Sequence, residues 1–134
     1  MASLDMDGPF ELEVKTIQGK VAGSPGNFAL GTLTPNKRFA VRLVGRSDSN
    51  LQQTLLQALK RGSGQPGFFA RLFSGKKPIN AFKFSHAMDA EAAYNKECRN
   101  FHNFGGLAKL ANTSHPKPPQ GVNVPCSFCK GEKA

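Results

Sequence analysis

The sequence predicts an α+β fold in which a small antiparallel three-stranded sheet is flanked by helices and followed by a zinc-knuckle-like tail. Three observations predict it: short runs that alternate apolar and polar residues, two stretches with helical periodicity, and a proline-rich end that carries a Cys-x-x-Cys pair. With 134 residues, 39% of them hydrophobic, the chain is long enough for one domain with a buried core. We therefore expect a single domain over residues 1–134.

The expected strands lie mainly in the first third of the chain. Residues 10–17 alternate apolar and charged side chains, which is typical of a half-buried strand. Residues 28–33 and 38–44 form the next two strands, and the Pro35-Asn36-Lys37 turn between them indicates a hairpin. Residues 82–84 are a further short strand candidate.

Two helices are expected after the hairpin. The first begins at Leu51, after possible N-caps at residues 47–49, and its leucine pattern ends at Gly62. The second covers residues 90–103, with Asp89 as its N-cap. The order of strands and helices predicts the α+β class rather than a parallel sheet with alternating helices.

Positive charge is concentrated in the middle of the chain. The net charge is +9, and residues 36–83 contain ten lysines and arginines against Asp48, the one acidic residue of that segment. Such a balance is expected of a surface that meets a polyanion, although a solvated face kept for solubility has the same composition. The residues expected to contact phosphates are Lys37, Arg38, Arg42, Arg46, Lys76 and Lys77.

A membrane protein is not expected. Mean hydropathy is −0.38, and no apolar run approaches the roughly 18 residues that a membrane-spanning helix needs. Residues 1–10 have neither the basic stretch nor the apolar stretch of a secretory signal, so we expect a cytoplasmic protein.

Cysteine and histidine residues predict a metal site. Cys98 and His102 are four residues apart on the second expected helix, so both side chains lie on one face. Cys126 and Cys129 form the Cys-x-x-Cys pair. Three thiols and one imidazole suit tetrahedral zinc, with His115 as a rival to His102 for the fourth position.

Such a zinc site has a structural role. Four protein ligands close the coordination sphere, and the ion ties the proline-rich tail, residues 105–134, back to the second helix. The alternative is that Cys98 is an ordinary buried cysteine and that the Cys-x-x-Cys pair is frayed or redox-active.

Several short motifs follow one another in a characteristic order over residues 24–104. Gly26-Asn27-Phe28 precedes the hairpin, Leu43-Val44-Gly45-Arg46-Ser47 precedes the first helix, and Glu97 lies in the segment that ends at His102. This order resembles the GIY-YIG nuclease domain, with the two tripeptides in the places of its two signatures. The tail also looks like that of bacterial members that end in His-Pro and Cys-x-x-Cys.

The resemblance implies phosphodiester cleavage in which two signature tyrosines and an arginine surround the phosphate and a glutamate holds Mg²⁺ or Mn²⁺. Glu97 takes the metal position. The two tyrosines are replaced by Phe28 and Leu43, whose side chains cannot donate, accept or titrate. The family's arginine falls at Thr54, which leaves Arg46 as the phosphate contact.

The sequence therefore favours a nucleic-acid-binding domain of this type with impaired or lost nuclease activity, and with DNA rather than RNA as its partner. An alternative is an active divalent-metal-dependent endonuclease, in which Tyr94 or His86 acts as the base. A third possibility is a protein-interaction module whose basic face meets an acidic partner.

Overall fold

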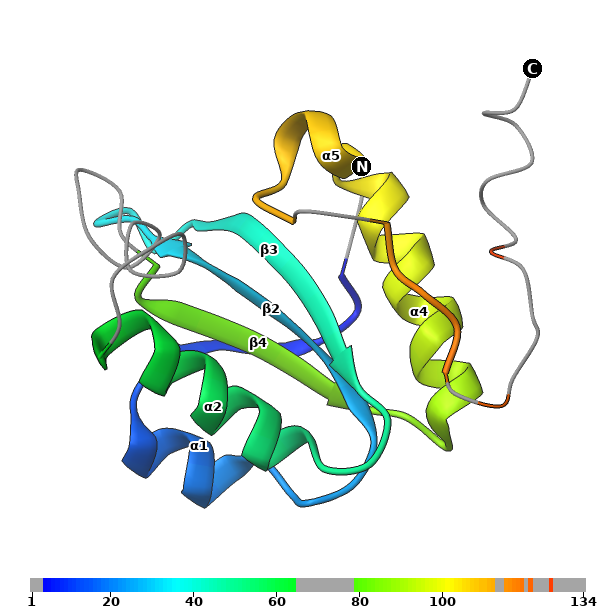
Figure 1. Cartoon of the computed structure of the whole chain (residues 1–134). Helices are drawn as coiled ribbons and strands as arrows, with labels where there is room; N and C mark the ends of the chain where they lie inside the picture. The colour runs from blue at the N-terminus through cyan, green and yellow to red at the C-terminus, as the bar shows by residue number, and fades with distance from the viewer. Residues whose placement is uncertain (1–3, 65–78, 113–114, 120, 122–125, 127–134) are drawn as a thin grey trace.

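A four-stranded antiparallel sheet lies at the centre of the molecule, with helices on both of its faces (Figure 1). The computed structural model describes residues 4–64, 79–112, 115–119, 121 and 126. Its elements, in chain order, are β1 (Asp7–Glu11), α1 (Val14–Lys20), β2 (Gly26–Leu33), β3 (Phe39–Ser47), α2 (Leu51–Gly64), β4 (Ala81–His86), α4 (Ala90–Asn103) and α5 (Gly106–Lys109). The α+β class is therefore confirmed.

The sheet has the strand order β1-β4-β2-β3, with every neighbouring pair antiparallel. The β2–β3 hairpin pairs from Gly26 opposite Ser47 to Leu33 opposite Phe39, and a bulge at Arg42 shifts the register along β3. β2 also pairs with β4, so it is a central strand.

Two of the sequence expectations are wrong at the N-terminus. The sheet has four strands rather than three, because β1 adds to the outer edge of β4. The strand expected over residues 10–17 ends at Glu11, and the chain then forms helix α1. Ile17 and Val21 lie one helical turn apart and are buried in the core beside α2, whereas Val14 is 50% exposed. Burial of that pair therefore outweighs the local alternation.

The two faces of the sheet bury different residues. Phe28 and Leu30 of β2 point toward α1 and α2, while Ala29 and Val44 point toward α4. Alternate residues of a strand point to opposite faces, so this division follows directly from the pleat. We call these the α2 face and the α4 face.

Side-chain caps fix where the two long helices begin. The carboxylate of Asp89 accepts a hydrogen bond from the amide of Ala92 at 2.8 Å, as its position in the sequence predicts. At α2 the cap is Asn50, whose Oδ1 accepts from the amide of Gln53 at 3.0 Å. Ser47 in turn accepts from the amide of Asn50 at 2.9 Å.

The segment after α5 covers the exposed edge of β3. The amide of Ala111 donates to the carbonyl of Arg42 at 2.6 Å, and the Asn112 side chain pairs with both the amide and the carbonyl of Val44. An edge strand is protected in this way from pairing with other chains. Pro116 and Pro119 are buried farther along the chain.

Among the described helices, none is long and apolar enough to cross a bilayer.

Candidate functional site

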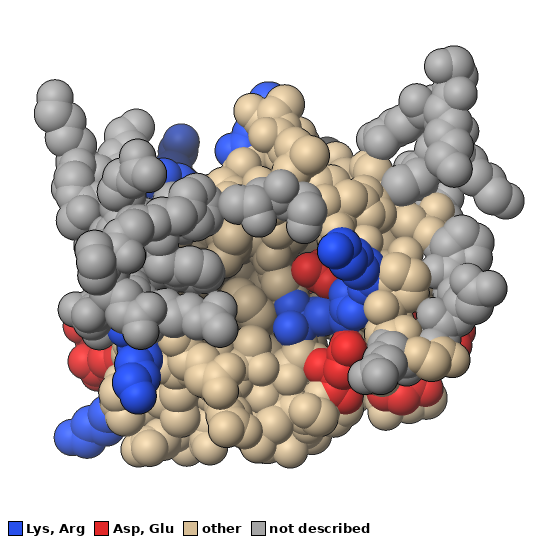
Figure 2. Space-filling model, viewed as in Figure 1, with Lys and Arg blue, Asp and Glu red and all other residues tan. Residues whose placement is uncertain are grey.

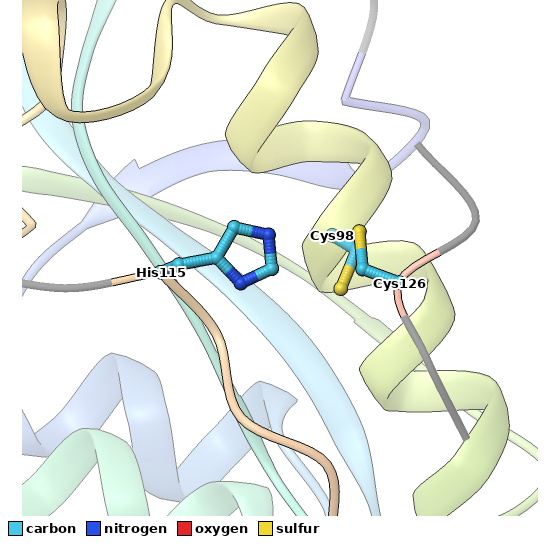
Figure 3. A group of neighbouring side chains, drawn as sticks. All are labelled: Cys98, His115 and Cys126. Atoms are coloured by element: carbon cyan, nitrogen blue, oxygen red, sulfur yellow. The ribbon is translucent and has the colours of Figure 1, made fainter. Parts of the chain in front are cut away.

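Two cysteines and a histidine come together beside helix α4 (Figure 3). The Sγ atoms of Cys98 and Cys126 and a ring nitrogen of His115 all lie within 4.8 Å of one another. Cys98 is fully buried and lies on α4, whereas His115 and Cys126 belong to the C-terminal segment. Their side chains point toward one another, and this buried group can hold a metal ion.

The hydrogen bond of His115 prepares its ring for metal binding. Its Nδ1 lies 2.7 Å from the carbonyl oxygen of Pro116. A carbonyl only accepts, so Nδ1 carries the proton and donates, and the lone pair of the neutral ring is on Nε2. Metal-bound histidines in proteins are commonly oriented by such a contact to their second nitrogen.

The thiols of Cys98 and Cys126 are both buried, so a nearby cation is needed to stabilise their ionised form. Burial raises the pKa of the Cys98 thiol to about 12, and its hydrogen bond with Cys126 adds to the shift, while Tyr94 opposes it. A bound metal ion reverses this balance, because its charge favours the thiolate.

His102 lies beside this group but is not part of it. Its Nε2 is 3.1 Å from the Nε2 of His115, and a cavity of about 500 Å³ adjoins both rings. The structure thus gives His115 the place that the sequence analysis preferred for His102. Cys129 lies outside the described residues.

A buried ion pair lies one residue away on the same helix. Arg46 Nη1 donates to Glu97 Oε1 at 2.6 Å and Nε donates to Asp48 Oδ1 at 2.7 Å. Nη2 donates to the carbonyl of Lys117 at 2.5 Å, and the guanidinium carbon lies 5.2 Å from the centre of the Tyr94 ring. The guanidinium is therefore enclosed by protein groups of opposite charge or polarity.

Burial governs the electrostatics of this pair. It raises the pKa of the Glu97 carboxyl, and the hydrogen bond and charge of Arg46 counteract the shift. For Arg46, burial disfavours the charged form, but hydrogen bonds to Asp48 and Glu97 outweigh it and raise its pKa. The side chains of Arg46 and Glu97 are 12% and 10% exposed, so each serves mainly as the partner of the other.

The expected catalytic residues do not converge on one site. Phe28 and Leu43 pack into the α2 face, and Thr54 donates from α2 to the carbonyl of Asn50. Glu97 lies on α4, across the sheet. The structure therefore brings Arg46 to Glu97 but separates that pair from the two signature positions.

Packing alone accounts for the glycine of the second signature. Phe28 pairs across the strands with Gly45, and a Cβ at Gly45 would lie 2.4 Å from the Phe28 ring. The aromatic ring occupies the space that a side chain would need.

The two residues considered as bases have structural contacts. Tyr94 is 2% exposed and packs with Cys98 and Cys126. His86, at the end of β4, accepts from the amide of Ala22 at 3.2 Å, and its Nδ1 lies 3.0 Å from the hydroxyl of Ser24. Tyr94 thus packs between the cysteines and the Arg46 guanidinium, whereas His86 is held by residues 22–25 at the other end of the sheet from the hairpin turn.

The expected phosphate contacts fall into three groups. Lys37 and Arg38 are exposed at the turn of the β2–β3 hairpin, whereas Arg42 is half-buried at the bulge and Arg46 is ion-paired. On the face shown in Figure 2, several of the blue side chains lie directly beside red ones. The remaining two candidates, Lys76 and Lys77, lie outside the described residues.

Sequence reasoning missed the groups that complete this region. Asp48 and the Lys117 carbonyl hold Arg46, and Asn112 directs the C-terminal segment along β3. The contacts of Lys117 and Asn112 have no local sequence signal, because the paired residues are 71 and 68 positions apart. Asp48 is only two positions from Arg46, but nothing in that spacing shows that the two side chains pair.

No protein-family model, curated protein or solved structure matches this chain. The functional interpretation therefore depends on the geometry of its own residues.

Proposed function

We propose that the chain is a DNA-binding domain without nuclease activity, whose C-terminal segment is held in place by a structural zinc ion. The observation that carries the proposal is the position of the cations at the hairpin turn. Lys37 and Arg38 are exposed there, and the one acidic residue of segment 36–83, Asp48, is bonded to Arg46. The excess positive charge of this segment therefore has no acidic counterpart within it.

The backbone of Lys37 supports a role for its side chain. Its φ is +64°, in the left-handed region that glycine and asparagine adopt more readily than lysine. A lysine at such a position costs stability of order 1 kcal/mol, and strain of this kind is often retained at functional positions. Contact with phosphate is a function that requires the lysine charge.

The separation of the signature positions from Glu97 supports the absence of cleavage. Phe28 and Leu43 are apolar and lie on the α2 face, while the Glu97 carboxylate is neutralised by Arg46 on the α4 face. Metal-assisted cleavage requires a metal ligand, a phosphate contact and a proton acceptor at one exposed point.

Zinc is the metal that suits the buried group best. Two thiolates and an imidazole favour zinc over magnesium or calcium, which prefer oxygen ligands. Cys98, His115 and Cys126 supply three ligands. We propose Cys129 as the fourth, with His102 as the alternative, so that the coordination sphere is closed and the ion is structural.

Fluorescence anisotropy with a labelled DNA duplex tests the binding function. We expect affinity to fall with salt, with a logarithmic slope of about −2 to −3 for contacts by Lys37, Arg38 and Arg42. The double change Lys37→Gln, Arg38→Gln should weaken binding and flatten the slope by about two units. The double change Lys15→Gln, Lys20→Gln on helix α1 removes the same two charges elsewhere and is the matched control.

Three results of these assays would contradict the proposal. A flat salt response would favour an acidic protein partner instead. An equal effect of the Lys15→Gln, Lys20→Gln control would show that net charge, rather than the hairpin turn, determines binding. Nicking of a plasmid in Mg²⁺ or Mn²⁺ that is abolished by Glu97→Ala would restore the nuclease alternative.

Elemental analysis tests the zinc site. Protein prepared without chelator should contain about one zinc ion per chain, and Cys126→Ser should lose the ion and lower the free energy of unfolding. Met88→Ser, at a 92% exposed position, should retain both. Zinc-free protein of undiminished stability would exclude a structural ion.

A further inference from the structure

We propose that residues 115–119 form a metal-held strap over Arg46, so that release of the ion exposes this arginine and strengthens DNA binding. The inference rests on the proposed function, because it names how binding at the same surface is regulated.

The strap occupies one edge of the guanidinium. The carbonyl of Lys117 accepts from Arg46 Nη2 at 2.5 Å, where an anionic oxygen of a ligand would otherwise bind. Pro116 and Pro119 are buried on either side of this residue. The backbone of the strap is therefore pressed against the protein at the point where it covers Arg46.

The metal group and the ion pair share their surroundings. His115 begins the strap, and Cys98 directly follows Glu97 on α4. Tyr94 packs against Cys98 and also lies under the Arg46 guanidinium. A change at the metal is therefore transmitted to Arg46 through groups in direct contact with both.

The chain before the strap has an anchor that does not depend on the ion. Asn112 is hydrogen-bonded to Val44 of β3, three residues before His115. Loss of the metal removes the ligand contact of His115 but leaves the Asn112 anchor intact. Residues 115–119 can then move away while Ala111 and Asn112 stay on the sheet edge.

Opening the strap gives Arg46 a free edge for a phosphate. Glu97 and Asp48 still hold Nη1 and Nε, so the guanidinium keeps its orientation and presents Nη2 outward. Asp48 is 42% exposed, so solvent and salt screen its repulsion of a phosphate. One added phosphate contact makes the logarithmic salt slope steeper by about 0.9.

The first experiment measures exposure of Arg46 without DNA. The full chain is treated with phenylglyoxal, which modifies accessible arginines, before and after zinc is removed by a chelator. Mass spectrometry should show that modification of Arg46 increases several-fold in the zinc-free protein, whereas Arg38, exposed in both states, reacts equally. Equal protection of Arg46 in both forms, with the fold retained by circular dichroism, overturns the inference.

The second experiment measures DNA affinity of the same two forms over a salt series. We expect the zinc-free protein to bind roughly 3- to 10-fold more tightly at low salt, with the steeper slope, and Arg46→Gln to abolish the difference. Pro119→Gly loosens the strap without removing a ligand, so it should reproduce the change with zinc bound. If the zinc-free chain unfolds, Pro119→Gly still tests whether a loosened strap strengthens DNA binding.

The outcomes separate the inference from the function on which it rests. Equal or weaker binding by zinc-free, folded protein and by Pro119→Gly overturns the strap but leaves DNA binding in place. Absence of binding in every form overturns the proposed function, and the strap as a regulator with it.

Discussion

The two faces of the sheet are built from the same strands, but it is the α4 face that combines buried apolar residues with most of the buried polar ones. The α2 face is apolar, with Phe28, Leu30 and Phe82 packed against the leucines of α2. The interface on the α4 face contains Asn27 and Glu97 among its buried residues, and the cysteine group lies beside α4. The buried polar and ionisable side chains are thus concentrated on the α4 face.

This difference shows that an alternating strand can serve two purposes. A buried polar group lowers the stability of the fold unless it is hydrogen-bonded or ion-paired. Buried polar side chains therefore indicate a specific structural or functional role. Both side-chain atoms of Asn100 and the Oδ1 of Asn27 are buried without a hydrogen-bond partner among the described residues. Burial of these unpaired atoms on the α4 face is unfavourable, and the apolar packing on the α2 face offsets this loss of stability.

The largest effect is expected on the α2 face. Phe82 is fully buried, and its ring lies 5.8 Å from that of Phe10 and 6.0 Å from that of Phe84. Phe82→Ala should lower the free energy of unfolding by about 3–5 kcal/mol, measured by urea denaturation, because it leaves a cavity. The zinc content of the remaining folded protein should not change. A loss of zinc in step with folding would mean that the two faces are not separable.

A smaller effect is expected from breaking the ion pair on the α4 face. Glu97→Gln leaves the Arg46 charge with Asp48 and the Lys117 carbonyl, and should cost about 2 kcal/mol in urea denaturation. The matched change Asp48→Asn acts on a side chain that is 42% exposed, and should cost below about 1 kcal/mol. The reverse order would show that Arg46 depends on the surface carboxylate instead.

The sequence correctly predicted those helices and strands that are determined by their own residues. Helix α4 has the expected bounds because the Asp89 cap and the apolar spacing of its buried face are both contained in its own residues. The hairpin follows from alternation and its turn. Helix α1 was missed because Val14 continues the alternation of the preceding residues, whereas the burial of Ile17 and Val21 that favours the helix depends on α2.

The candidate site could be predicted only in part for the same reason. The spacing of the cysteines identified Cys98, Cys126 and Cys129 as candidate ligands. The choice between His102 and His115 depends instead on the path of the chain after α5. That path is fixed by the contact of Asn112 with β3. The Arg46–Glu97 pair joins residues 51 positions apart, a distance at which spacing carries no information.

A third prediction concerns the close contact within the hairpin. Gly45→Ala places a Cβ against the Phe28 ring and should destabilise the protein by about 1–3 kcal/mol, measured by thermal or urea unfolding. Phe28→Leu in the same chain should recover part of this loss. Gly19→Ala is the control, since nothing lies within 4 Å of its Cβ and the helix should gain about 0.5–1 kcal/mol. Equal effects of the two glycine changes would contradict the packing explanation.

The smallest effect on stability, and the sharpest on function, is expected at Lys37. Lys37→Asn should raise the free energy of unfolding by about 0.5–1 kcal/mol, because asparagine tolerates the left-handed backbone at φ +64°. Lys37→Gln removes the same charge without that relief, so its stability should stay near that of the unaltered chain. Both changes should weaken DNA binding and reduce the salt slope by about one unit. If Lys37→Asn raised stability and left DNA affinity intact, the lysine would be a solubility feature and the hairpin turn would not be the binding surface.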